Sequence, residues 1–145
     1  MSINKKISVI GLGYVGLPLA VALSKSFEVV GFDINESRVK ELNAHNDKTL
    51  EVAKKELKKA NNLKISSNQN DIAGSDIFIA TVPTPIDEKN NPDLIALKMA
   101  SKTIACAIKK GSIVVYESTV YPGCTEEICV PILEKCSNLS FNKDF

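Results

Sequence analysis

Hydrophobic residues along the chain alternate between short runs rich in β-branched residues and longer stretches where they recur every three or four positions. The first pattern is typical of strands buried on both faces, and the second of amphipathic helices. Because the two patterns alternate, the chain is predicted to form a parallel sheet with helices on both faces. The predicted strands are 6–10, 28–33, 63–66, 76–81 and 113–117.

Three helices are predicted in the first half of the chain. The first contains Pro18, which is tolerated because amides of a first helical turn have no partner within the helix. Asn35 and Thr49 are the predicted N-caps of the second and third, since their side-chain oxygens can accept from first-turn amides. The third helix is expected to turn Leu50 and Leu57 toward the core.

Two further helices are predicted in the second half. Asp93 is expected to cap a long helix that contains Cys106 and stops at Gly111. The last helix is expected to begin near Thr125, and Pro131 should kink it because proline cannot donate to the helical ladder. The polar stretch 87–92 is predicted to be a surface loop at the edge of the sheet.

This succession predicts one domain, residues 1–145, with the doubly wound α/β/α architecture of a Rossmann fold. Such a sheet normally has six strands in the order 3-2-1-4-5-6. The chain supplies five, and the apolar residues at 139–141 only hint at an approach to a sixth. The domain is therefore predicted to be truncated before or at the sixth strand, as a piece of a longer protein.

Charge and hydropathy narrow the function classes. The 18 basic and 17 acidic side chains give a formal net charge of +1, so no long-range field attracts nucleic acid or anionic lipid. The lysine-rich run at 54–59 is interpreted as a solvated helix face. No stretch approaches the roughly 18 apolar residues of a membrane span, and no cleavage site follows the N-terminus. A cytoplasmic protein is expected.

The four cysteines and the single histidine do not form a recognisable site. No CxxC pair is present, so neither a metal site nor a disulfide scaffold is indicated. Cys129 and Cys136 are seven apart and are expected to be buried on one helical face. Cys124, in a loop, is the alternative candidate for a reactive thiol. His45 lies in a polar run away from strand ends and is interpreted as exposed.

The motif with the clearest chemistry is GxGxxG, formed by Gly11, Gly13 and Gly16 between the first strand and the first helix. The first glycine permits a tight turn, and the second lets a diphosphate approach the backbone. The third allows close packing of helix on strand. The free amides and positive dipole at the helix start can then bind two negative charges without a lysine.

An acidic residue at the end of the second strand completes this fingerprint. Asp33 lies 22 residues after Gly11 and is predicted to accept hydrogen bonds from the ribose hydroxyls of adenosine. A carboxylate at this point repels a 2′-phosphate, which favours NAD over NADP. Arg38 complicates that prediction, since its side chain is either a further ligand of the adenosine moiety or a solvated helix residue.

Two more segments fall at carboxyl ends of strands, where open α/β sheets bind their ligands. The first is 81–85, where the hydroxyls of Thr81 and Thr84 could reach a ribose or phosphate oxygen. The second is 117–123, where Thr119 could bond near the nicotinamide and order a water. Each segment alone is equally well interpreted as a capped turn.

Four ordered motifs, KISVIGLGYVGLP at 6–18, TVPTPID at 81–87, PDL at 92–94 and ESTVYPG at 117–123, together resemble the UDP-glucose/GDP-mannose dehydrogenase family. The resemblance is to its N-terminal NAD-binding domain, and is greatest to bacterial UDP-N-acetylhexosamine 6-dehydrogenases of surface-polysaccharide pathways. It implies an oxidoreductase that converts the C6 alcohol of a nucleotide sugar to a carboxylate, with two NAD molecules as hydride acceptors.

The resemblance also implies roles for individual residues. Tyr14 and Val15 would offer backbone amides to the pyrophosphate, and Asp33 and Arg38 would hold the adenosine ribose. Thr84 and Thr119 would line the dinucleotide cleft, and Thr119 would help to place the catalytic water. The full-length enzyme would be a homodimer that binds a UDP-sugar.

In that family the nucleophilic cysteine and the sugar-binding residues lie well beyond position 145, and none of the four cysteines here matches the nucleophile. The chain by itself is therefore predicted to bind NAD weakly and to turn over no nucleotide sugar. Two alternatives stay open: another Rossmann dehydrogenase, and a stand-alone regulatory module that senses NAD.

Overall fold

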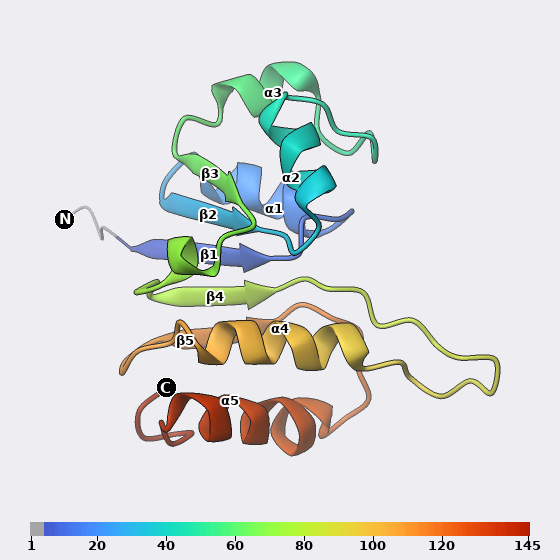
Figure 1. Ribbon diagram of the computed structural model, residues 1–145, viewed down its shortest axis with the longest axis vertical. Helices are drawn as coiled ribbons and strands as arrows, with labels where there is room; N and C mark the ends of the chain where they lie inside the picture. Colours follow the sequence, from blue (N-terminus) through green and yellow to red (C-terminus); the bar gives the residue numbers. More distant parts are fainter. Residues whose placement is uncertain (1–4) are drawn as a thin grey trace.

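The computed structural model describes residues 5–145. Residues 1–4 lie outside the described residues, and the prediction that no cleavage site follows the N-terminus falls partly on them. Five parallel strands form a single sheet in the order β3-β2-β1-β4-β5, and their carboxyl ends share one edge (Figure 1). The sheet therefore has the predicted doubly wound arrangement. The strands are β1 (Lys6–Ile10), β2 (Glu28–Phe32), β3 (Leu63–Ser66), β4 (Ile77–Ala80) and β5 (Ile113–Tyr116).

Helices cover both faces of the sheet. Side chains alternate between the faces along each strand, so that Val9 and Ile10, both buried, belong to different hydrophobic clusters. One face packs against α1 (Gly16–Leu23), α2 (Glu36–Asn43) and α3 (Lys54–Lys59). The other packs against the short helix η1 (Gln69–Ile72), α4 (Ile95–Ala105) and α5 (Val130–Ser137).

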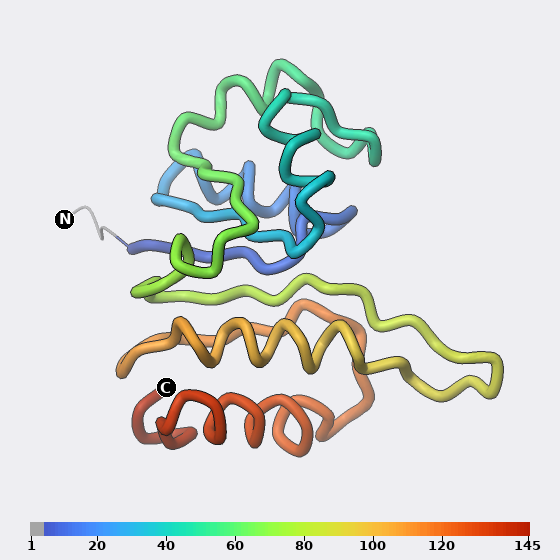
Figure 2. The backbone as a smooth tube through the Cα atoms, viewed as in Figure 1, coloured from blue at the N-terminus to red at the C-terminus, as the bar shows by residue number. Residues whose placement is uncertain are grey.

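The connection between β4 and α4 projects beyond the carboxyl edge of the sheet as an arm (Figure 2). A bridge between Ile86 and Pro92 closes it, and the Asp87 carboxylate accepts hydrogen bonds from the backbone amides of Lys89 and Asn91, both at 2.8 Å. The predicted surface loop at 87–92 is therefore exposed, but it has a defined internal structure.

The prediction for the third helix is wrong at its start. α3 begins at Lys54 with Ala53 as N-cap, five residues after Thr49. The Asp47 carboxylate accepts the amide and hydroxyl of Thr49, and Leu50 has a φ of +58°, which no α-helix allows. Leu50 is consequently 89% exposed instead of buried, whereas Leu57 is buried as predicted.

The second half also departs from expectation in detail. α4 begins at Ile95, whose amide donates to the Asp93 carboxylate at 2.9 Å, and its C-cap is Cys106. Cys106 therefore lies at the end of the helix and is exposed. A π-helical turn, η2 (Thr125–Cys129), precedes α5, and Pro131 occupies the second position of α5. At Pro131, where a kink was predicted, the structure has a change of helix type in the turn before the proline.

The cysteine prediction is half right. Cys129 is fully buried, but Cys136, in the last turn of α5, is exposed. Cys124 is also fully buried and packs with Cys129 and Leu97. No helix in residues 5–145 has the length and apolar character that a membrane span requires.

Candidate functional site

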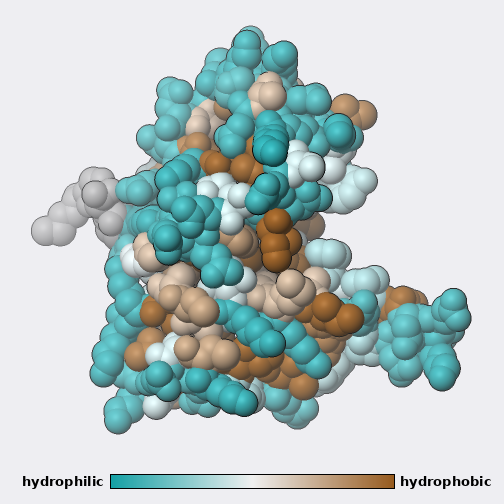
Figure 3. Space-filling view, in the orientation of Figure 1, coloured by the Kyte–Doolittle hydropathy of each residue, from teal (hydrophilic) through white to brown (hydrophobic). Residues whose placement is uncertain are grey.

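A pocket of about 810 Å³ opens at the carboxyl edge of the sheet. It lies over the point where the strand order reverses between β1 and β4, which is where open α/β sheets bind ligands. Figure 3 shows this region as a hollow with apolar surface at its centre. The pocket is lined by the loop after β1, the end of β2, the loops after β4 and β5, and one side of α4.

The glycine-rich loop after β1 forms one wall, and each glycine has a distinct structural reason. Gly11 has a φ of +97°, a conformation that side chains disfavour. A Cβ on Gly16 would collide with the carbonyl oxygen of Gly11 and the hydroxyl of Thr81. A Cβ on Gly13, by contrast, would meet nothing within 4 Å. Gly13 therefore presents bare backbone to the open pocket.

Two amides at the start of α1 face solvent. Tyr14 and Val15 are 70% and 54% exposed, and among the described residues neither backbone N–H has an acceptor within hydrogen-bond distance. Val15 is the N-cap of α1 and provides no side-chain cap. Unpaired amides immediately before a helix lie at the positive end of its dipole and form a ready anion site.

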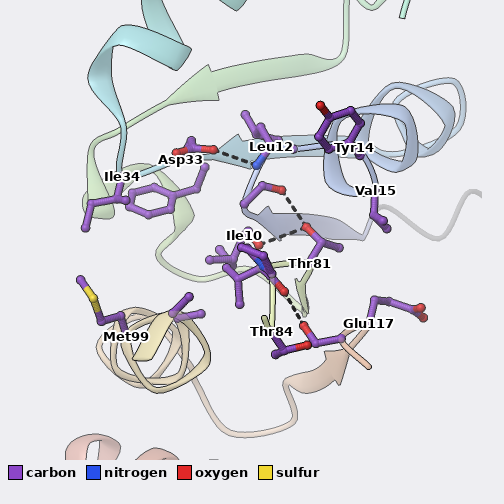
Figure 4. Close-up of a pocket in the computed structure, with 18 of the residues that line it drawn as sticks. Ile10, Leu12, Tyr14, Val15, Asp33, Ile34, Thr81, Thr84, Met99 and Glu117 are labelled. Atoms are coloured by element: carbon purple, nitrogen blue, oxygen red, sulfur yellow. Dashed lines mark hydrogen bonds between the residues drawn. The ribbon is translucent and has the colours of Figure 1, made fainter. Parts of the chain in front are cut away.

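Asp33 lies at the carboxyl end of β2 and lines the same pocket (Figure 4). One carboxylate oxygen accepts the Leu12 amide at 2.9 Å, and the other accepts the Asn35 amide at 2.9 Å. These bonds fix the carboxylate beside the glycine-rich loop. Each carboxylate oxygen has a second lone pair, so Asp33 can still accept from a ligand hydroxyl.

Arg38 does not line the pocket. Its guanidinium lies behind the glycine-rich loop, where Nε donates to the Leu12 carbonyl at 3.0 Å. The terminal nitrogens donate to Glu41 at 2.7 Å and to Asp47 at 2.8 Å. Its side chain is only 11% exposed, so the interpretation of Arg38 as a solvated helix residue is wrong.

The threonines after β4 tie the pocket walls together. Thr81 donates to the carbonyls of Ile10 at 3.1 Å and Gly11 at 2.7 Å, which anchors the start of the glycine-rich loop. Thr84 donates to the Thr119 carbonyl at 2.9 Å. Both hydroxyls were predicted to reach a ribose or phosphate oxygen. In the structure each donates to a backbone carbonyl, so only its lone pairs stay available to a ligand.

Glu117 lies in the loop after β5, on the side of the pocket away from Asp33 (Figure 4), and Thr119 lines the pocket from the same loop. Thr119 is exposed, and among the described residues its hydroxyl has no hydrogen-bond partner. The neighbouring Ser118 donates to the Val82 carbonyl at 2.7 Å, so this loop is attached to the one after β4. Within residues 5–145, Glu117 and Asp33 are the only charged side chains that line the pocket.

The apolar end of the pocket was missed in the sequence. Ile34, 67% exposed, and Met99, 48% exposed, approach each other across the opening beside Asp33 (Figure 4). Phe32 and Ala100, both buried, also line the pocket. Exposed apolar residues on two separate elements are individually unremarkable in a sequence, and only the fold shows that they line one apolar slot.

Cys124 cannot act as the reactive thiol considered from the sequence, because it is fully buried. Burial also raises the pKa of the nearby Cys129 thiol, against hydrogen bonds from Ser101 and Tyr116. Both sulfurs are therefore structural. His45 has an intermediate exposure and a φ of +58°, and it does not line the pocket.

Comparison with known proteins identifies relatives that are nucleotide-sugar dehydrogenases. The profile of the UDP-glucose/GDP-mannose dehydrogenase family, NAD binding domain, matches residues 5–145. The chain is 58% identical over 140 residues to a UDP-N-acetyl-D-glucosamine 6-dehydrogenase of Pseudomonas aeruginosa, covering 97% of this chain and 33% of the relative. It is 54% identical over 140 residues to the protein of that name in Salmonella typhi, with the same coverage.

Solved structures agree. A UDP-D-ManNAc dehydrogenase of Pyrococcus horikoshii superposes with a TM-score of 0.90 at 35% identity, over 97% of this chain and 34% of that one. A ternary complex of GDP-mannose dehydrogenase from Pseudomonas aeruginosa gives a TM-score of 0.85 at 28% identity, over 92% and 33% of the two chains. The present chain thus spans about a third of the length of these relatives.

Proposed function

The chain belongs to the UDP-glucose/GDP-mannose dehydrogenase family, as its NAD binding domain, and from this premise we propose that it is the coenzyme-binding part of a UDP-N-acetylhexosamine 6-dehydrogenase. Such an enzyme oxidises the C6 alcohol of the sugar to a carboxylate for surface-polysaccharide synthesis. Sequence identity supports UDP-N-acetylglucosamine as the substrate. The chain is 54–58% identical to the two UDP-N-acetyl-D-glucosamine 6-dehydrogenases and 35–40% identical to four UDP-N-acetyl-D-mannosamine dehydrogenases. The homodimer and the cytoplasmic location remain predictions of this proposal.

The residues of the pocket fit NAD. Bare backbone at Gly13 and the unpaired amides of Tyr14 and Val15 suit a diphosphate, which needs donors and close approach. Asp33, fixed beside that loop, suits the two hydroxyls of an adenosine ribose. The apolar slot between Ile34 and the opposite helix suits a flat base.

The opposite end of the pocket is where the chemistry would take place. NAD, when bound, supplies the acceptor for the hydride that leaves the C6 carbon of the sugar. Thr119 offers a hydroxyl that has no hydrogen-bond partner in the described part of the chain, and this hydroxyl can hold a water molecule near that end. Thr84 fixes the backbone of Thr119 and so orients the loop that carries this hydroxyl. Arg38 is held outside the pocket, so we assign the ribose contact to Asp33 alone.

One observation carries this proposal: the open face of Gly13 and the two unpaired amides lie in the same pocket as the fixed carboxylate of Asp33. The carboxylate would repel the extra phosphate of NADP at this position. The arrangement accordingly supports NAD as the coenzyme, and it requires no basic side chain in the pocket.

A calorimetric titration of the chain with NAD, NADP and S-adenosylmethionine tests the proposal. NAD is expected to bind and NADP to bind at least about tenfold more weakly, a difference of roughly 1.4 kcal/mol. Asp33→Asn should weaken the binding of NAD and reduce the difference between the affinities for NAD and NADP. A control, Asp87→Asn, alters a carboxylate on the projecting arm and should leave both affinities unchanged. Binding of S-adenosylmethionine alone would refute an oxidoreductase role.

The dehydrogenase and the stand-alone sensor are separated by a second measurement. The chain mixed with NAD and UDP-N-acetylglucosamine is expected to form no NADH at 340 nm, whereas the longer protein that contains it should do so. If the longer protein binds NAD but oxidises no UDP-sugar, the alternative of a regulatory module that senses NAD is supported instead.

A further inference from the structure

The peptide groups on either side of Leu12 in the glycine-rich loop are held from opposite sides. The Leu12 amide donates to the Asp33 carboxylate at 2.9 Å, and the Leu12 carbonyl accepts from Nε of Arg38 at 3.0 Å. The Leu12 side chain is fully buried. Leu12 is thus the fixed point from which the chain continues to Gly13 and the unpaired amides.

Arg38 is in turn held by two carboxylates. Glu41 receives a hydrogen bond from Nη1 at 2.7 Å, and Asp47 receives one from Nη2 at 2.8 Å. The side chains of Arg38 and Glu41 are only 11% and 10% exposed, and that of Asp47 is not exposed. While the terminal nitrogens are paired in this way, the Nε–H points at the Leu12 carbonyl.

Asp47 is itself fixed by the loop that follows it. Its carboxylate accepts the amides of Thr49, Glu51 and Val52, each at 3.0 Å, and the Thr49 hydroxyl at 2.7 Å. These bonds account for the non-helical course of residues 47–52. A buried, fully bonded carboxylate of this kind gives Arg38 a rigid partner.

We propose that Asp47 is a positioning residue of the coenzyme site, which acts through Arg38 on the Leu12 carbonyl and so sets the direction of the amides that bind the diphosphate. Asp47 does not line the pocket. The inference rests on the proposed function, because it assigns the effect to the diphosphate. It also gives the loop at 47–52, which has no contact with the pocket, a part in binding.

The chemistry of the contact makes two variants informative. Arg38→Lys keeps a positive charge for Glu41 and Asp47 but has no Nε–H for the Leu12 carbonyl. Asp47→Asn keeps the shape of the side chain and removes the charge that holds the guanidinium. A matched control is Asp71→Asn, which breaks the 2.6 Å ion pair with Lys64 on β3, away from the pocket.

The test combines two measurements on the intact chain by NMR. Hydrogen exchange of the Leu12 amide without ligand reports whether the loop is held, and titrations with NAD, ADP and adenosine report which part of the ligand is affected. Both variants are expected to speed the exchange of this amide and to lower the affinities for NAD and ADP about tenfold. This is the size of effect expected when one charge-assisted hydrogen bond is misplaced. Adenosine, which has no phosphate, should change by less than about twofold.

The outcomes are distinct. An unchanged Leu12 exchange rate in both variants would overturn the proposal, whether or not the wild-type chain binds NAD. Equal losses for adenosine and ADP would also overturn it, because they indicate a general structural effect. Failure of the wild-type chain to bind any of the three ligands would refute the proposed function, while the exchange rates would still decide whether Asp47 fixes the loop. If Asp47→Asn does not fold, Arg38→Lys decides both questions.

Discussion

Replacing either of two glycines with alanine should separate the folding role of the loop from its binding role. At Gly16 the added Cβ would overlap the Gly11 carbonyl oxygen and the Thr81 hydroxyl, and would lie 2.9 Å from the Gly11 carbonyl carbon. Two of these three atoms belong to the backbone and cannot rotate away. Relief requires a shift of α1 relative to β1, in a region where Leu17 and Ala20 are fully buried.

The magnitude follows from the atoms displaced. Overpacking of a tight interior costs typically 1–3 kcal/mol, and loss of the Thr81 hydrogen bond to Gly11, 2.7 Å long, adds about 1 kcal/mol. A total near 3 kcal/mol is a large fraction of the ~5–15 kcal/mol stability of a typical domain. In a chain of this size it corresponds to a fall in Tm of roughly 10 °C.

Gly13→Ala is the matched control. Its Cβ meets nothing within 4 Å and its φ is outside the left-handed region. The variant should therefore keep the wild-type stability to within about 1 kcal/mol. It should nevertheless weaken NAD binding, because the methyl group occupies the space through which the diphosphate approaches. Urea denaturation followed by circular dichroism, and calorimetry with NAD, measure the two effects. Wild-type stability of Gly16→Ala, or wild-type NAD affinity of Gly13→Ala, would refute the reasoning.

Three further predictions concern groups outside the pocket. Burial opposes ionisation of Asp47, but its hydrogen bonds lower its pKa to about 2 from 3.8. The ionised carboxylate therefore contributes roughly 2 kcal/mol of stability above pH 4, which should be lost as pH falls toward 2. Urea denaturation across this pH range should show a much smaller loss in Asp47→Asn. Ellman's reagent should label two thiols in the native chain, Cys106 and Cys136, and four after unfolding; labelling of a third native thiol would contradict the buried cluster. Burial raises the pKa of Tyr116 above its usual value near 10, so its contribution to stability is lost as pH rises beyond 10. Tyr116→Phe, which removes the 2.7 Å bond to Ser101, should cost about 1 kcal/mol at pH 7 and reduce that alkaline loss.

Local sequence pattern was sufficient for the sheet and for the outline of the site. The short apolar runs located all five strands to within a residue or two, because a strand covered by helices on both faces is a continuous run of apolar, mostly β-branched residues. The spacing of Gly11, Gly13 and Gly16 likewise specified a turn and a helix start, since the positive φ of Gly11 and the close contacts at Gly16 both disfavour a side chain. Asp33 followed from its place at the end of the second strand.

Boundaries and partners needed the tertiary structure. Thr49 has the composition of an N-cap, yet its amide and hydroxyl bond to Asp47, which delays the next helix to Lys54. Arg38 looked like a ligand or a solvated side chain, and it is neither lining the pocket nor exposed. Such outcomes depend on which of several competing hydrogen-bond partners is nearest in space, a question that spacing along the chain does not answer.

The amino-acid sequence by itself therefore determined the strand pattern, the glycine turn and the acidic end of the second strand, all of which depend on forces between near neighbours. Only the folded chain decided that Ile34 and Met99 enclose one slot, that Cys124 is inaccessible, and that Asp47 is linked through Arg38 to the glycine-rich loop. These features join residues that are 9 to 65 positions apart, by contacts that exist only once the two faces of the sheet are covered.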